Sequence, residues 1–325
     1  MIAFGPVPSR RLGHSLGVNN IPPKHCSYAC VYCQLGRTPH MQVARRRFYA
    51  PAAIARQVEA KIASARQSEE TVDYLTFVPD GEPTLDANLG HEIKALKPLE
   101  IPIAVITNSS LIGREDVRRD LLQADWVSLK MDAVREDIWQ RVDRPHGSLR
   151  LPEILEGALE FAHVYEGQLM TETMLVGGVN NSPAMMEDLA AFLARLQPTV
   201  AYLGIPTRLP AEAWVEPPPE AAFNRAFRVL SAALPEVEAL IGYEGNAFAF
   251  TGDAAQDLLS ITAVHPMRQD AVSAFLTRAD ADWAVVEDLL HREQLTEMSY
   301  KGHQFYLRRF NQQQHSQESS GAKGG

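Results

Sequence analysis

Between about Arg10 and Ile205, short apolar runs alternate with longer segments of helical periodicity, and this alternation limits the fold more than any other feature. The runs typical of strands are HSLGVN, DYLTFV, IPIAVIT, DWVSLKM, QLMTETMLV and VAYLGI. The segments between them repeat apolar residues at intervals of three and four, as helices do: 52–67, 87–96, 115–123, 151–165 and 183–196. We therefore predict an α/β fold of six β/α units with a parallel sheet. Periodicity alone does not separate an open or partial barrel from a doubly wound sheet.

Glycine-rich and polar segments directly follow the predicted strands. In parallel α/β folds, ligands bind where strands end and the chain turns outward. We therefore expect these segments to share one rim. In chain order they are the cysteine segment, 79–83, 107–110, Lys130 with Asp132, 176–180 and 206–208.

Three cysteines, Cys26, Cys30 and Cys33, fall within the string CSYACVYC, and the chain has no others. A disulfide framework needs an even number, and a closed structural zinc site needs four ligands. Three thiolates suit a [4Fe-4S] cluster, which normally takes four, so one iron is left open to bind a substrate or cofactor. Zinc held by the cysteines with His25 or His40, and thiols without a metal, are the alternatives.

The chain has 325 residues, 46% hydrophobic and 22% charged, which allows one large domain and a small one. No run reaches the roughly 18 apolar residues of a membrane span, and the first residues lack the apolar stretch of a signal peptide. We expect a cytoplasmic protein without membrane contact. The net charge of −9 argues against tight nonspecific binding to nucleic acid.

The last part of the chain has a different pattern. A proline-rich stretch at 216–219 leads into a helix over 220–234, and 239–251 is expected to be irregular or strand-like cover. Two helical patterns, 269–277 and 281–293, precede alternating runs around a Lys301-Gly302 turn. This order resembles a winged helix. The near-neutral charge of the segment favours a structural or protein-contact role over binding of duplex nucleic acid. We predict a barrel with its cover over 1–260, a winged-helix-like domain over 261–310 and a disordered tail over 311–325.

The spacing C-x3-C-x2-C, with Tyr32 before the last cysteine, resembles that of the radical S-adenosylmethionine (SAM) superfamily. Several phrases, among them GPVPSRRLGHSLGVN, DGEPTL, TNSSL, RPH, ETMLVGGVNN and HPMR, are similar to its stand-alone members grouped with wyosine-base synthetases, which build a tricyclic guanosine in tRNA. The resemblance implies a partial (β/α)6 barrel, with the cluster loop after its first strand. It also implies that the open iron chelates SAM and that an electron cleaves SAM to a 5′-deoxyadenosyl radical, which abstracts hydrogen from a substrate. An external flavodoxin or ferredoxin would supply the electron.

The same resemblance implies cofactor contacts. Gly81-Glu82-Pro83 is similar to the GGE-type motif that holds the SAM amine, with Asp80 in place of the first glycine. Lys130 and Ser128 share a strand face and would contact the SAM carboxylate or ribose, although Lys130 could instead form a Schiff base with a carbonyl substrate. The remaining contacts have structural alternatives: Asn108 would contact ribose or form an Asx turn, and Asn180 would contact adenosine or belong to an ordinary turn.

Five charged residues are candidates for substrate binding: Arg10, Arg11, Arg144, Glu172 and Arg208. We expect the arginines near the strand ends, where the substrate enters, although Arg144, Arg208 and Glu244 could equally form structural ion pairs. Glu172 lies among apolar neighbours and needs a partner, for which Lys130 or Arg144 are candidates. The sequence thus predicts a radical SAM enzyme of unknown substrate. A wyosine-type tRNA-modifying enzyme, which the charge does not favour, and a noncatalytic metal-binding regulatory protein are the alternatives.

Overall fold

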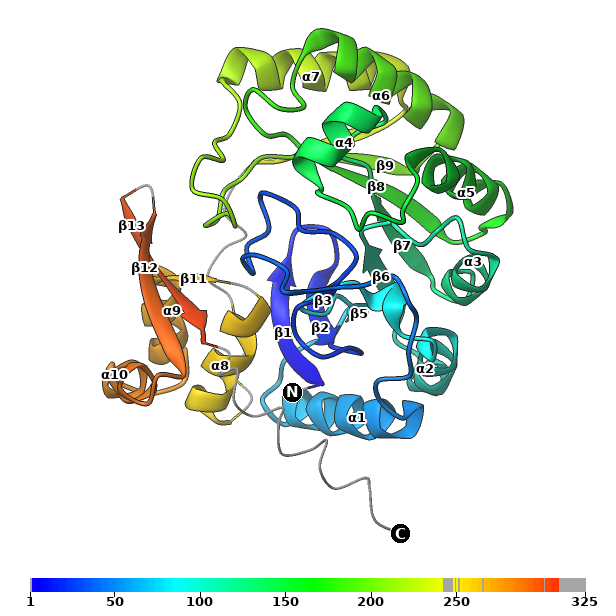
Figure 1. The fold of residues 1–325 in the computed structure, drawn as a ribbon. Helices are drawn as coiled ribbons and strands as arrows, with labels where there is room; N and C mark the ends of the chain where they lie inside the picture. The colour runs from blue at the N-terminus through cyan, green and yellow to red at the C-terminus, as the bar shows by residue number, and fades with distance from the viewer. Residues whose placement is uncertain are drawn as a thin grey trace.

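The computed structural model describes residues 2–241, 248, 250, 252–264, 266–300 and 302–309. Its main sheet has eight strands in the order β1-β2-β5-β6-β7-β8-β9-β10 (Figure 1). From β2 onward each strand runs parallel to the next, whereas β1 pairs with β2 in the antiparallel sense. The strands are β1 (Ala3–Ser9), β2 (Gly13–Val18), β5 (Tyr74–Phe77), β6 (Ile103–Thr107), β7 (Trp126–Lys130), β8 (Gln168–Met174), β9 (Val200–Gly204) and β10 (Val237–Leu240).

Helices cover the outer face of this sheet (Figure 1). In α1 the residues Ile54, Val58 and Ile62 recur at the helical interval and are buried, so one stripe of the helix closes the core. A proline in the first turn, where no intrahelical N–H bond is lost, begins α1, α5 and α6. The helices are α1 (Pro51–Gln67), α2 (Leu89–Leu96), α3 (Glu115–Leu121), α4 (Glu136–Val142), α5 (Leu151–Val164), α6 (Pro183–Leu196) and α7 (Glu220–Ala233).

The prediction of an α/β fold with six β/α units is confirmed, and the strand order decides between the two architectures left open. A doubly wound sheet reverses its strand order at a switch point. Here the order follows the chain from β2 to β10 without reversal, as in a barrel. Among the described residues β1 and β10 do not pair with each other, so the barrel is partial.

Two strands of the main sheet differ from the sequence prediction. β1 was not predicted, because Pro6 and Pro8 interrupt its apolar run; it lies at the sheet edge, where missing N–H donors are tolerated. β10 begins before the cover segment predicted at 239–251, much of which lies outside the described residues.

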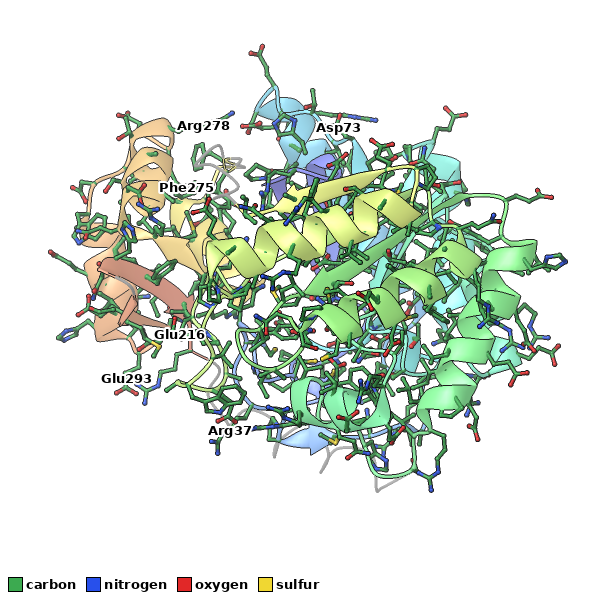
Figure 2. All side chains as sticks on the ribbon, turned by 90° about the horizontal axis from the view of Figure 1, so that it is seen from above. Arg37, Asp73, Glu216, Phe275, Arg278 and Glu293 are labelled. Carbon is green, nitrogen blue, oxygen red and sulfur yellow. The ribbon has the colours of Figure 1, made fainter. Side chains whose placement is uncertain are left out.

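A second apolar cluster lies in the C-terminal part of the chain. Its buried members include Leu258, Phe275 and Val286. Arg278, which Figure 2 shows near Phe275, joins this part to the barrel by an ion pair with Glu70. α8 packs on both β1 and β13, and the boundary predicted at residue 260 falls inside α8. The winged-helix-like assignment and the domain limits stay predictions, and 310–325 lie outside the described residues. The elements are α8 (Ala254–Val264), β11 (Met267–Arg268), α9 (Gln269–Arg278), α10 (Ala284–His291), β12 (Leu295–Tyr300) and β13 (His303–Arg308), with sheet order β11-β13-β12.

Candidate active site at the carboxyl ends of the strands

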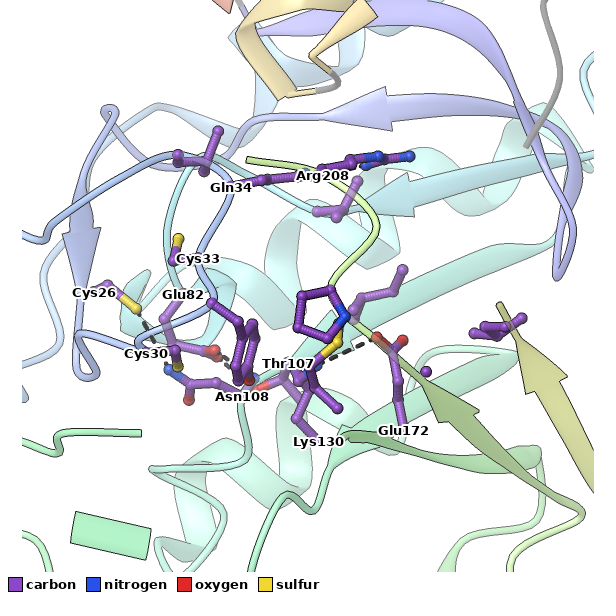
Figure 3. Close-up of a pocket in the computed structure, with 18 of the residues that line it drawn as sticks. Cys26, Cys30, Cys33, Gln34, Glu82, Thr107, Asn108, Lys130, Glu172 and Arg208 are labelled. Atoms are coloured by element: carbon purple, nitrogen blue, oxygen red, sulfur yellow. Dashed lines mark hydrogen bonds and ion pairs between the residues drawn. The ribbon is translucent and has the colours of Figure 1, made fainter. Parts of the chain in front are cut away.

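A cavity of about 320 Å³ lies within the partial barrel (Figure 3). It brings together the three cysteines and most of the side chains that the sequence singled out. Its lining includes Cys26, Cys30, Cys33, Gly81, Glu82, Asn108, Lys130, Arg10, Arg11, Glu172 and Arg208. Apolar side chains, among them Ile106, Met174, Ile205 and Leu240, form much of the remaining wall.

The cysteine loop follows β2 and is anchored on the end of α4. The N–H groups of Ala29 and Val31 donate to the carbonyls of Asp143 and Val142, at 3.0 Å each. Within the loop, Cys33 N donates to Cys30 O (3.1 Å), which folds the last two cysteines into one turn. The loop is therefore held in place by backbone contacts that do not depend on the thiols.

The thiols are free and half-buried, and the carboxyl groups of Glu82, Asp132 and Asp143 lie near two of them, Cys26 and Cys30. Burial raises the pKa of Cys26 to about 12, and the nearby Glu82 carboxylate adds to the rise. The Cys30 thiol donates to Asp143 Oδ1 (3.4 Å), and burial together with Asp132 raises the pKa of Asp143. Burial also raises the pKa of Cys30, so Cys26 and Cys30 are protonated without a metal, and binding iron as thiolates would release their protons.

Gly81 is where the DGE segment meets the cysteine loop. Glu82 N donates to His25 O (3.0 Å), and Lys24 N donates to Asp80 O (2.7 Å). A Cβ on Gly81 would lie 1.9 Å from His25 O, so this approach requires glycine. The contact fixes the cysteines relative to Glu82.

Glu82 presents its carboxylate at the edge of the cavity. Oε1 accepts hydrogen bonds from Thr84 N (3.0 Å), Thr84 Oγ1 (2.5 Å) and Thr107 Oγ1 (2.6 Å), and Oε2 accepts one from Asn108 N (2.7 Å). Burial raises the pKa of Glu82, and these donors oppose the rise. The donors also fix the direction of the carboxylate.

Asn108 forms the Asx turn, one of the two roles that the sequence left open, whereas its contact with ribose stays a prediction. Its Oδ1 accepts from Ser110 N (3.0 Å), which is an Asx turn. Its Nδ2 donates to Ser27 Oγ (2.9 Å) and lies 3.5 Å from Cys26 Sγ. The amide therefore tethers the loop after β6 to the cysteine loop at the cavity.

A charged triad lies deeper in the cavity. Lys130 Nζ lies 3.2 Å from Glu172 Oε1, and Arg11 pairs with the other carboxylate oxygen. Burial alone would raise the pKa of Glu172, but Arg11 and Lys130 outweigh it and lower the pKa to about 2. Burial would lower the pKa of Lys130, but Asp132 and Glu172 outweigh it and raise the pKa. Lys130 is thus an ammonium group, which suits anion binding better than Schiff-base attack.

Arg10 and Arg11 reach the cavity from an unexpected place. They lie in the turn between β1 and β2, at the amino end of β2 and not on the carboxyl rim. The Arg11 side chain extends into the barrel, where its Cζ lies 5.9 Å from the centroid of the Tyr202 ring. The sequence analysis did not predict this turn, because it did not predict β1, the first strand of the hairpin.

Three predicted side chains do not line the cavity: Ser128, Asn180 and Arg144. Ser128 is fully buried on the strand face that carries Lys130. Asn180 donates to the carbonyls of Asp132 and Met174 and accepts from Val176 N, so it shapes the loop after β8. Arg144 pairs with Glu212 (2.5 Å), which also pairs with Arg37. Glu244 and the His40 side chain lie outside the described residues.

Two charged residues beside the cysteines were not predicted as site residues. Within the described part of the chain, the buried Lys24 Nζ has no hydrogen-bond partner; burial lowers the pKa of Lys24, opposed by Cys33, Asp80 and Cys26. Burial raises the pKa of Asp80 to about 7, opposed by Lys24 and Arg308. Asp80 stands where the GGE-type motif has its first glycine, and this difference could have signalled a charged group beside the cysteines.

The radical SAM family model matches residues 20–193. The chain is 44% identical over 309 residues to a UPF0026 protein of Methanocaldococcus jannaschii, covering 94% of this chain and 96% of that protein. A radical SAM methyltransferase of Sphaerobacter thermophilus aligns with TM-score 0.54 and 20% identity, over 69% of this chain and 66% of that one. SuiB of Streptococcus suis bound to SAM aligns with TM-score 0.50 and 13% identity, over 69% and 49%.

The parallel partial barrel and the cavity at its strand ends thus define an enzyme of the radical SAM type. The chain belongs to the radical SAM superfamily, and its relatives include the UPF0026 proteins. Within the part of the chain that the structure describes, no helix is both long and apolar enough to cross a lipid bilayer.

Proposed function

We propose that the protein holds one [4Fe-4S] cluster on Cys26, Cys30 and Cys33 and uses it to cleave SAM, so that a 5′-deoxyadenosyl radical abstracts hydrogen from a substrate. The observation that carries the proposal is that the three thiols of one loop line the same cavity as Glu82, Asn108 and Lys130. The donor set fits the cluster, since three thiols leave one iron without a protein ligand. The buried Lys24 ammonium beside the loop also fits a group that brings negative charge.

Each side chain has a distinct part in this proposal. Glu82, whose direction is fixed by Thr84, Thr107 and Asn108, would accept the ammonium of the SAM methionine moiety. Lys130 would bind its carboxylate, and Asn108 would contact the ribose. Ser128 and Asn180 would act through their neighbours, by supporting Lys130 and the loop after β8.

The bound cluster would supply one electron to SAM. An external one-electron donor, a flavodoxin or ferredoxin, would have to deliver it to the cysteine loop. We place the enzyme in the cytoplasm, where a reducing environment keeps thiolates available for iron.

The test is anaerobic reconstitution with iron and sulfide, followed by dithionite and SAM. The wild type should form 5′-deoxyadenosine, and Cys30→Ala should form none. Glu82→Gln should keep its iron content yet bind SAM at least tenfold more weakly, because a neutral amide replaces the partner of the ammonium. A wild type that binds a cluster but forms no 5′-deoxyadenosine would refute the proposal.

The wyosine-type alternative makes a separate prediction. A tRNA substrate requires binding that weakens steeply with salt, because phosphate contacts release counterions. The net charge of −9 does not favour it. Absence of tRNA binding at low salt would remove this alternative, and SAM cleavage would remove the noncatalytic one.

A further inference from the structure

Asp132 has no part in the proposed handling of SAM, yet it is only 3% exposed. It follows β7, two residues beyond Lys130. A carboxylate that is withdrawn from water needs partners that stabilise it. The partners of Asp132 therefore indicate what it does.

The two carboxylate oxygens of Asp132 bind different elements. Oδ1 accepts a hydrogen bond from Met174 N (2.6 Å), which ties the end of β7 to the end of β8. Oδ2 accepts a hydrogen bond from the hydroxyl of Tyr32, which lies between Cys30 and Cys33 in the cysteine loop. The carboxylate thus joins the cysteine loop to the strand ends.

The same carboxylate acts on Lys130. Burial would lower the pKa of Lys130, but Asp132 and, after it, Glu172 outweigh the burial. Lys130 Nζ also lies 3.2 Å from Glu172 Oε1 (Figure 3) and 4.8 Å from the centroid of the Tyr32 ring, a distance typical of cation–π contacts. The ammonium is therefore held in place by two carboxylates and by the ring that Asp132 fixes.

The cysteine loop is thus fixed on two sides. At its start, Glu82 N donates to His25 O (3.0 Å), which fixes the loop relative to Glu82. At its end, the Tyr32 hydroxyl binds Asp132, which fixes the loop relative to Lys130 on the same strand end. Glu82, Tyr32 and Lys130 all line the cavity, so both contacts shape the space where SAM would bind.

We propose that Asp132 is a positioning residue for SAM, which acts through the Tyr32 hydroxyl to set the distance between the cysteine loop and the Lys130 ammonium. This inference rests on the proposed function, in which the cysteines hold the cluster and Lys130 meets the SAM carboxylate. SAM then has to meet the open iron and Lys130 at once. A cavity whose two sides are not held together therefore binds SAM more weakly, because the ligand has to order it.

The test is a double-mutant cycle on the anaerobically reconstituted protein, without reductant. Tyr32→Phe removes only the hydroxyl, and Asp132→Asn removes the carboxylate but keeps an acceptor for Met174 N. Both variants should assemble as much iron as the wild type. The dissociation constant for SAM, measured by isothermal titration calorimetry per bound cluster, should rise at least about fivefold in each, because a hydrogen bond to a charged group is lost.

The double variant shows whether the two residues act together. It should bind SAM no more than about twofold more weakly than Asp132→Asn alone, because without the carboxylate the hydroxyl has no role left. If Asp132→Asn does not fold, Tyr32→Phe still tests the contact.

Tyr165→Phe is the matched control. It also removes a tyrosine hydroxyl that donates one hydrogen bond, to Ala124 O (3.0 Å), but Tyr165 does not line the cavity. It should bind SAM as the wild type does.

Three results would overturn the inference: wild-type affinity for SAM in Tyr32→Phe, losses of affinity that add up in the double variant, or a fall in iron content that accounts for the whole loss of SAM binding. The last result would mean that Asp132 only supports the fold. A wild type that binds a cluster but no SAM would instead contradict the proposed function.

Discussion

Lys130 and Glu172 are register partners on the adjacent strands β7 and β8, and Lys130 Nζ lies 3.2 Å from Glu172 Oε1. Arg11 meets the same carboxylate from a turn 161 residues away in sequence. The pairing therefore joins the first hairpin to the middle of the barrel. It also sets the charge of the cavity where we expect the substrate.

Glu172→Gln should destabilise the protein. The change removes the carboxylate that Arg11 and Lys130 share, and removing one member of a buried ion pair costs about 3 to 5 kcal/mol. Anaerobic urea unfolding measures the free energy of unfolding. Asp188→Asn, which loses a surface pair with Arg135, is the matched control and should change it by less than about 1 kcal/mol.

The stability that Glu172 contributes should also depend on pH. Because its pKa is lowered to about 2, ionised Glu172 contributes stability above its unfolded pKa of about 4.3, and this contribution is lost as pH falls toward 2. The difference between wild type and Glu172→Gln should thus be constant from pH 8 to pH 5 and shrink below about pH 4. If wild type and Glu172→Gln were equally stable at pH 6, ionised Glu172 would not stabilise the fold through Arg11 and Lys130.

Glu92→Gln should stabilise the protein at alkaline pH. Glu92 is fully buried on α2, its Oε2 accepts from Asn20 Nδ2 (3.2 Å), and burial together with Asp86 raises its pKa. The folded protein then holds a proton that the unfolded chain releases above about pH 4.3, so stability falls as pH rises through this window. The variant should match wild type near pH 4 and exceed it at pH 8 by about 1 kcal/mol or more. Lower stability than wild type at pH 8 would show that Glu92 is ionised in the fold.

Gly81→Ala should reduce cluster assembly. The added methyl group would lie 1.9 Å from His25 O, so the DGE segment and the cysteine loop must separate. Iron and sulfide content after reconstitution should fall at least several-fold, together with the melting temperature. Gly147→Ala meets nothing within 4 Å and should reconstitute normally. Full iron content in Gly81→Ala would mean that the contact does not set the position of the cysteines.

Lys24→Met should leave the stability of the cluster-free protein intact but lower the reduction potential of the bound cluster. The buried Lys24 ammonium has no hydrogen-bond partner among the residues described, so its removal should not destabilise the cluster-free protein. With the cluster bound, loss of a nearby positive charge should make the reduction potential more negative. A redox titration followed by electron paramagnetic resonance measures this, with Lys97→Met, from a surface pair with Asp125, as the control. An unchanged potential would place Lys24 outside the electrostatic environment of the cluster.

The sequence predicted those strands whose apolar residues form an uninterrupted run and are buried in the fold. The strands β2 and β5 to β9 are short apolar runs, and the fold places each in the sheet. β1 was missed because prolines are compatible with a strand only at a sheet edge, and whether a strand lies at an edge is a tertiary property.

The site could be predicted only in part, because position along a strand does not give the direction of a side chain. Lys130 and Asn180 both follow apolar runs. Lys130 lines the cavity, whereas the Asn180 amide donates to the carbonyls of Asp132 and Met174. Of the two partners considered for Glu172, Lys130 contacts it and Arg144 pairs with Glu212 instead. The contact with Arg11 depends on a hairpin that the sequence did not reveal.

The most direct test of the central claim is the electron paramagnetic resonance spectrum of the anaerobically reconstituted, dithionite-reduced protein with and without SAM. The account predicts the signal of one reduced [4Fe-4S] cluster, whose g-values shift when SAM binds the open iron. Zinc in the anaerobically purified protein, or a cluster signal that does not change with SAM, would contradict it.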